Sequence, residues 1–476
     1  MSSPWQRSSG TYYSRRGGYN AAPLWRRWKT KIPRSPSPEL GQVLTKIYRK
    51  DLIESTADIE GPLQITNCQD VASYNWLNRG SPTILVPGAP AEWKPPSQTI
   101  QLQEDSGQYF RDPNAARYPS YPMQPAVEAV FMEHPNFPTA SIDIVACGST
   151  LGNLLRFVRR TGGKFRFIVE VVGSTVFFVR RENTPTELIP NVFGYGHAFP
   201  EAYTMWTEET KGSGSHQRIV RYNFAGLDCL VRFQSDGFFP DRIPKDDKEP
   251  DESKGNNDSN DDLSAIFSGL DVSEINTTVP AQDNKLDILA GGKRIPSSAV
   301  FDLKTRAIGK KHIDTLGQEI QRLWIAQIPH FVLAFHDRGL FDKNEIHIKD
   351  VREDVMAWEK DHQESLLKFA VLLQKILALV RSLPDTRLEI YRESAEGPLE
   401  LRQACEDVQP ALPEDLANRW ILGTQANEHV NEHEHHFSPE DEQEISLIEW
   451  SDSDESSVKD LTACSADCGY CGHCGY

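Results

Sequence analysis

Apolar residues recur along the middle of the chain in two patterns, one typical of strands and one of helices. Short apolar and β-branched runs predict strands at 142–146, 165–172, 174–181, 217–224, 227–233, 298–305 and 330–335. Helical spacing predicts helices over 125–133, 150–160, 318–326 and 363–381. The mixture predicts an α+β protein whose core is a mixed β-sheet flanked by helices.

Composition divides the chain into a folded part and three polar segments. Residues 41–235 and 297–422 carry the predicted elements and form a single domain, although 61–125 is proline-rich and predicts only short strands and irregular structure. Residues 1–40 are rich in Ser, Gly, Tyr, Arg and Pro and predict a disordered basic arm. Residues 236–296 predict a disordered acidic insert, and residues 423–476 an acidic tail rich in His and Cys.

The acidic net charge of the chain does not exclude a polyanionic partner such as RNA. The net charge is −17, yet the first 38 residues contain basic and no acidic side chains, and the local field decides binding. The arm is either a solvated tail or a phosphate contact, with Tyr12, Tyr13, Trp25 and Trp28 able to stack on bases.

No apolar run approaches the roughly 20 residues of a membrane span, and no secretory segment opens the chain. We therefore expect no membrane partner, and a location in the nucleus or cytoplasm.

Charged residues within an apolar strand are the main chemical signal. The segment AVFDLKT places Asp302 and Lys304 two residues apart, and thus on one face of a strand. Burying them requires a partner or a metal. Converging carboxylates bind Mg²⁺ or Mn²⁺, which activates water while a lysine offsets charge. Taken alone, the pair equally fits an exposed ion pair on an edge strand.

Five segments occur in an order that resembles a known family. From Pro122 to Ser382 the chain contains GSTLGNLL, GYGHAFPE, GSHQRIVRYNFAGLDC, FDLKT and RLWIAQIPHFVLAF, which resemble the motifs of the DXO-type decapping and 5′–3′ exoribonuclease family. The resemblance implies a D/E-x-K nuclease-like fold, binding of RNA 5′ ends, and metal-dependent phosphodiester hydrolysis on incompletely or noncanonically capped RNA. The expected cofactor is Mg²⁺ or Mn²⁺.

The resemblance also implies site residues. The metal ligands would be the carboxylates of Glu201, Asp228 and Asp302 and the carbonyl of Leu303. The catalytic side chains would be Lys304 and Gln327, and His216 and Arg218 would contact RNA.

Several positions depart from the family pattern. The family's E-x-D is Gly226-Leu227-Asp228 here, so one carboxylate is missing. Its arginine-glycine turn is Cys147-Gly148, which removes a positive charge near the RNA 5′ end. Its E-x-K is D-x-K, and Pro200 is an extra residue before Glu201. The alternative function is therefore a catalytically impaired homologue that binds RNA or a partner protein.

The tail suggests a third, unrelated function. Four thiolates satisfy one tetrahedral zinc ion, and the tail contains Cys464, Cys468, Cys471 and Cys474, with His473 as a substitute ligand. A reduced, solvated tail is the alternative, as it is for the histidines at 429–436. The apolar hexad 445–450 between acidic flanks is typical of a segment that docks on a partner. Together these features predict a scaffold protein that uses its tail.

Overall fold

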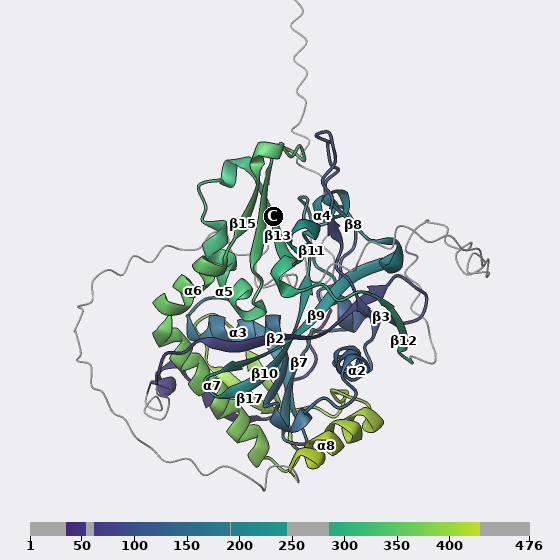
Figure 1. The fold of residues 1–476 in the computed structure, drawn as a ribbon. Helices are drawn as coiled ribbons and strands as arrows, with labels where there is room; N and C mark the ends of the chain where they lie inside the picture. Colours follow the sequence, from purple (N-terminus) through teal and green to yellow (C-terminus); the bar gives the residue numbers. More distant parts are fainter. Residues whose placement is uncertain (1–34, 54–60, 191, 245–284, 429–476) are drawn as a thin grey trace, which may run out of the picture. The chain divides into compact units, whose positions relative to one another are not determined.

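Two β-sheets form the framework of the protein. The computed structural model describes residues 35–53, 61–190, 192–244 and 285–428 (Figure 1). The larger sheet has 11 strands in the order β1 (Val43–Ile47), β17 (Leu399–Gln403), β16 (Arg387–Arg392), β6 (Phe165–Val172), β7 (Thr175–Arg180), β5 (Ile144–Cys147), β10 (Leu227–Ser235), β9 (Ser213–Phe224), β2 (Ile65–Leu77), β3 (Thr83–Gly88) and β12 (Asp287–Gly292). Parallel and antiparallel pairs both occur, which confirms the predicted mixed sheet.

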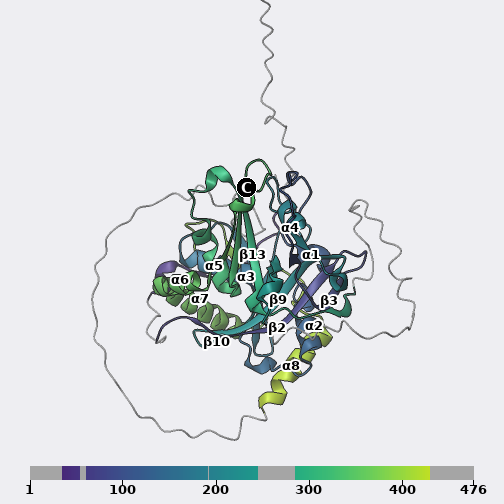
Figure 2. The same ribbon diagram turned by 45° about the horizontal axis from the view of Figure 1, so that its top comes forward.

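Both faces of this sheet are buried, because its strands alternate between two apolar clusters. On β5, Ile144 and Ala146 belong to one cluster, whereas Val145 and Cys147 belong to the other. The first cluster is completed by α3 (Gly148–Val158), α5 (Thr315–Ala326), α6 (Arg352–Asp361) and α7 (Gln363–Ser382). The second is completed by α2 (Gln124–Glu133) and α8 (Glu414–Glu428). The two sets of helices lie on opposite sides of the sheet (Figure 2).

The smaller sheet has six strands in the order β15 (Ile346–Asp350), β14 (His330–His336), β13 (Val300–Ala307), β11 (Gly237–Phe238), β4 (Glu92–Trp93) and β8 (Thr204–Met205). Its aromatic core includes Phe199 and Tyr203 of α4 (Ala198–Tyr203). The chain passes from β10 of the larger sheet to β11 of the smaller through the single residue Asp236. The ends of the two sheets are therefore fixed next to each other at this residue.

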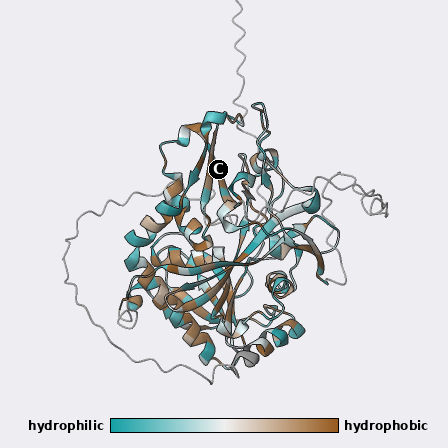
Figure 3. Cartoon of the chain, viewed as in Figure 1, coloured by the Kyte–Doolittle hydropathy of each residue, from teal (hydrophilic) through white to brown (hydrophobic). Residues whose placement is uncertain are grey.

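Short elements complete the described part. They are α1 (Pro113–Arg117) and the 3-10 helices Arg49–Leu52, Thr139–Ser141, Glu208–Thr210, Pro240–Arg242, Ser297–Ala299, Ile308–Lys310 and Lys343–Glu345. Apolar residues concentrate on the strands and on the helices that cover them (Figure 3). Within the described ranges, every helix is too short or too polar to cross a membrane.

The predicted insert is too wide at both ends. Residues 236–244 contribute β11, and β12 lies between residues 285 and 296. These short strands form because they pair with β13 and β3, and such pairing has no local sequence signal. The tail likewise begins later than predicted, since α8 continues to Glu428. The arm up to residue 34, the histidine group, the hexad and the four tail cysteines lie outside the described residues.

Candidate functional site

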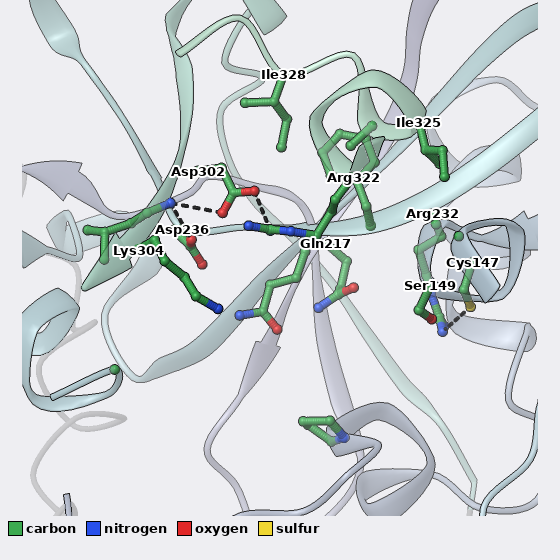
Figure 4. A pocket seen from close by; sticks show the side chains of 18 of the residues that line it. Cys147, Ser149, Gln217, Arg232, Asp236, Asp302, Lys304, Arg322, Ile325 and Ile328 are labelled. Carbon is green, nitrogen blue, oxygen red and sulfur yellow. Dashed lines mark hydrogen bonds and ion pairs between the residues drawn. The ribbon is translucent and has the colours of Figure 1, made fainter. Parts of the chain in front are cut away.

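A polar pocket lies where the two sheets meet, between the end of β10, strand β13 and helices α3 and α5 (Figure 4). Its cavity volume is about 190 Å³. An apolar cavity of about 150 Å³ holds one benzene molecule, so the pocket accommodates a group the size of a phosphate with part of a sugar.

Strand β13 supplies one wall of the pocket. Asp302, Lys304 and Arg306 occupy alternate positions, line the pocket and are all buried, the most exposed of them at 9%. Strand β13 has β14 on one side and β11 on the other, so it is not an edge strand. The alternative of an exposed ion pair on an edge strand is therefore wrong.

A second carboxylate, which the sequence analysis missed, lies beside Asp302. Gly237 pairs with Phe301 at the start of β11, which brings the preceding residue, Asp236, next to Asp302. The Leu303 N–H donates to Asp236 Oδ2 and to Asp302 Oδ1, both at 2.8 Å. Burial, followed by the charge of Asp302 and a hydrogen bond that the protonated Asp236 donates to Asp302, raises the pKa of Asp236 well above its ordinary value. Asp236 therefore keeps its proton to a higher pH than an exposed aspartate does.

Gln234, two residues before Asp236 on the same stretch of chain, also lines the pocket. This polar pair at the end of a strand, directly before the polar insert, was the available signal. Gln234 contributes a neutral amide to the lining.

An arginine already neutralises Asp302. Arg322 of α5 forms an ion pair with Asp302 and donates from Nε to Glu319 Oε2 at 3.0 Å. The fully buried Glu319 also lies 3.3 Å from Lys304 Nζ. Acidic and basic side chains therefore alternate along this wall, as Figure 4 shows for Asp236, Asp302, Arg322 and Lys304.

The rest of the pocket lining is strongly cationic. It includes Arg111, Arg156, Arg180 and Arg232. Burial of these groups is compensated by acidic neighbours: Glu187 lies 3.9 Å from Arg111, and Glu182 lies 2.7 Å from Arg180. Basic side chains nevertheless outnumber acidic ones around the pocket, which favours an anionic ligand.

Arg232 supplies the positive charge that Cys147 lacks. The two residues are partners in the parallel pairing of β10 with β5. Arg232 Nη2 donates to Cys147 Sγ at 2.8 Å, and both residues line the pocket. A positive charge therefore lies directly beside Cys147 in the pocket lining.

The amino end of α3 also faces the pocket. Gly148 and Ser149, the first residues of this 11-residue helix, line it. Helix amino ends carry backbone N–H groups and partial positive charge, so they favour anions. The end of α3 thus adds to the field of the arginines.

Two of the predicted metal ligands lie outside the pocket. Asp228 is at the start of β10, where it pairs with Arg221 at 2.9 Å. At about 3.3 Å per residue, the length of the strand separates Asp228 from Asp236, so its expected convergence with Asp302 does not occur. Glu201 is exposed on α4. Partial desolvation of its carboxylate, followed by the negative charge of Asp105, raises its pKa. Its neighbour Pro200 lines the pocket instead.

The predicted RNA contacts face away from the pocket. His216 and Arg218 are buried on β9, and Gln217 between them lines the pocket from the other face of the strand. His216 Nδ1 is 2.6 Å from Asn75 Oδ1, and Arg218 Nη1 donates to Ile295 O at 2.8 Å. Both side chains therefore have internal partners.

Gln327 caps a helix. It follows the last residue of α5 in the left-handed conformation, with φ 51°, and its Nε2 donates to Trp324 O at 2.6 Å. Its neighbours Ala326 and Ile328 line the pocket, whereas Gln327 does not. Leu303, the remaining predicted ligand, does line it.

The side chains at the pocket are a poor set of ligands for a divalent cation. Among the described residues, no three His, Cys, Asp or Glu side chains form a group that could hold a metal ion. Of the two neighbouring carboxylates, Asp236 has a raised pKa, which disfavours its charged form, and Asp302 is paired with Arg322. Gln234 brings no charge. The residues present therefore do not fit a resident Mg²⁺ or Mn²⁺ ion.

The class defined by this fold and pocket is an α+β protein with a D-x-K strand beside a cationic cavity. The chain belongs to the family described as "Domain of unknown function (DUF8563)", whose model matches residues 62–420. A search of curated proteins finds no match.

Several solved structures are similar to this chain. Rai1 of Scheffersomyces stipitis, in complex with (3′-NADP)⁺ and calcium, is 11% identical over 81% of this chain and 100% of its own, with a TM-score of 0.49. Rai1 of Candida albicans, in complex with pU5-Mn²⁺, is 10% identical over 78% and 98%, with a TM-score of 0.46. Dxo1 of K. lactis, in complex with manganese, is 9% identical over 78% and 96%, with a TM-score of 0.41. All three are DXO-family proteins, the family that the sequence motifs resemble.

Proposed function

We propose that this protein binds the phosphorylated 5′ end of RNA in the pocket between its two sheets. The observation that carries the proposal is the lining itself. Five buried cations, Arg111, Arg156, Arg232, Lys304 and Arg306, surround one cavity together with the amino end of α3. Fixed guanidinium groups and helix amino ends are the elements with which proteins bind phosphate.

The choice of RNA among phosphorylated ligands rests on the motifs. The segments that resemble the DXO family, including CGSTLGNLL and FDLKT, are those that line the pocket. The cavity of about 190 Å³ suits a terminal phosphate with part of its sugar. The remainder of the RNA would leave through the open side of the pocket.

Hydrolysis of the RNA 5′ end is the second candidate function. It is favoured by the convergence of Asp236, Asp302 and Lys304 on one wall. Gln234 and Arg322 oppose it, because they replace charge that a metal-dependent hydrolase needs. Binding without turnover is therefore the function that the geometry supports better.

Binding of short RNAs of one sequence tests the proposal. Fluorescence anisotropy in EDTA would compare 5′-monophosphate with 5′-hydroxyl RNA. We expect the phosphorylated RNA to bind at least tenfold more tightly, because one charge-assisted contact is worth roughly 1.5–3 kcal/mol. Affinity should fall as salt increases.

Two variants make this test specific. Lys304→Gln should lose about tenfold in affinity for the phosphorylated RNA. Lys349→Gln is the matched control, since Lys349 pairs with Asp354 at the exposed edge strand β15 and should bind as wild type does. Equal affinity for both RNAs would refute the proposal. Product formed with Mg²⁺ or Mn²⁺ by wild-type protein, and absent with Asp302→Asn, would establish hydrolysis instead.

A further inference from the structure

The cation that balances the pocket carboxylates belongs to the chain itself. Arg322 is paired with Asp302 and, through Nε, with Glu319 at 3.0 Å. The side chains of these two carboxylates are 3% and 1% exposed, whereas that of Arg322 is 33% exposed. The guanidinium thus lies between buried negative charge and the cavity that the ligand would enter.

The helix that carries Arg322 holds it in this direction. Leu323 and Trp324 are fully buried on the side of α5 that packs into the core. Gln321, Arg322, Ile325 and Ala326 line the pocket. Trp324 Nε1 donates to Glu359 Oε2 of α6 at 2.6 Å, which fixes the rotation of α5 about its axis. Arg322 is therefore placed by the fold.

Three of the four carboxylate oxygens of this pair already have a partner. Asp302 Oδ1 accepts from the Leu303 N–H, and Asp302 Oδ2 forms the ion pair with Arg322. Asp236 Oδ2 accepts from the same N–H. A divalent ion would need lone pairs of these oxygens, so it would have to displace Arg322 first.

We propose that Arg322 is a built-in cation that takes the role of a divalent metal ion, bridging Asp302 and the phosphate of the ligand. An arginine fork makes paired hydrogen bonds to both carboxylate and phosphate. Its single charge and fixed attachment allow it to hold an anion, but supply no site that activates water. The pocket consequently binds phosphate without metal.

Titration with Mn²⁺ alone tests this inference. Free Mn²⁺ would be followed by electron paramagnetic resonance, in wild-type protein and in Arg322→Gln, each checked for its folded state by circular dichroism. We expect weak binding to wild type and at least tenfold tighter binding to Arg322→Gln. Adding Asp302→Asn to that variant should abolish the gain, and Arg322→Lys, which keeps the charge, should show none.

A matched control removes an arginine from a carboxylate pair elsewhere. Arg221 pairs with Asp228 at 2.9 Å, and the side chain of Asp228 is 28% exposed, against 3% for Asp302. Water can compensate the charge of Asp228 once the arginine is removed, so Arg221→Gln should leave Mn²⁺ binding unchanged. Wild-type protein that binds Mn²⁺ as tightly as Arg322→Gln, with loss in Asp302→Asn, would overturn the inference.

A second readout covers the case in which Arg322→Gln does not fold. It rests on the proposed function and uses wild-type protein. The affinity for 5′-monophosphate RNA should be the same in EDTA and in Mg²⁺, and a tenfold gain with Mg²⁺ would contradict the built-in cation. Absence of any RNA binding would refute the proposed function alone, since the Mn²⁺ titration requires no RNA.

Discussion

At Asp302 the protein buries a carboxylate that is 2% exposed. An uncompensated buried charge costs several kcal/mol, and removing one partner of a buried pair typically costs about 3–5 kcal/mol. Arg322 and the Leu303 N–H provide the compensation. The same balance explains why loss of the arginine would leave a site that attracts another cation.

Asp236 should make stability depend on pH. Its pKa is raised in the folded protein by burial and by Asp302, whereas the unfolded chain releases this proton near pH 4. The folded state therefore loses stability as the pH rises from about 4 toward the raised pKa. Asp236→Asn, which stays neutral and can make the same hydrogen bonds, should remove this loss.

Thermal and urea unfolding between pH 4 and pH 8.5 would measure the effect. We expect Asp236→Asn to exceed wild type by about 1–3 kcal/mol in the free energy of unfolding at pH 8, with the difference vanishing near pH 4. Asp228→Asn, whose side chain lies in an ion pair away from the pocket, is the control. A less stable Asp236→Asn at pH 8 would show that the carboxylate is ionised in the folded state.

Among the elements, α5 ends at a residue that the motif resemblance assigns to catalysis. Gln327 has a left-handed backbone, which glycine adopts without strain. Gln327→Gly should therefore change the free energy of unfolding by less than about 1 kcal/mol, since relieved strain offsets the lost hydrogen bond to Trp324 O. RNA affinity should equal that of wild type. A tenfold loss of RNA affinity with an unchanged free energy of unfolding would show that Gln327 contributes to RNA binding.

Elements with a strong local pattern could be predicted from the sequence. Strand β6 has the predicted bounds, and α7 differs by one residue. Strand β2 was missed as one long element, because its 13 residues include the polar run TNCQD. These residues are held in the strand by pairing with β9. Such pairing between distant segments leaves no periodic signal.

The residues of the pocket were likewise predictable only where the local sequence carries a signal. Asp302 and Lys304 were predicted because two charges interrupt an apolar strand. Asp236 was missed because it reaches Asp302 only through the register of β11 with β13. Arg322 was missed because an arginine on an amphipathic helix resembles any solvated residue. Asp236 and Arg322 are brought to the pocket by contacts between distant parts of the chain, which the sequence does not display.

In the described part of the molecule, segments far apart along the chain bring basic side chains to one cavity. Arg111, Arg156, Arg232 and Lys304 come from four separate elements or loops, although the whole chain has a net charge of −17. Local field rather than net charge decides anion binding. The remaining acidic charge would then oppose RNA from outside the pocket.

The acidic segment 245–284 allows this opposition to be measured. Replacing it with a Gly/Ser linker of half its length should change the free energy of unfolding by less than about 1 kcal/mol, because halving a loop contributes only about 0.6 kcal/mol. RNA affinity should increase in low salt, and the gain should vanish as salt screens the removed charge. A full-length segment with its Asp and Glu changed to Asn and Gln separates charge from length and should give the same gain. Unfolding of either variant would instead place this segment within the stable fold.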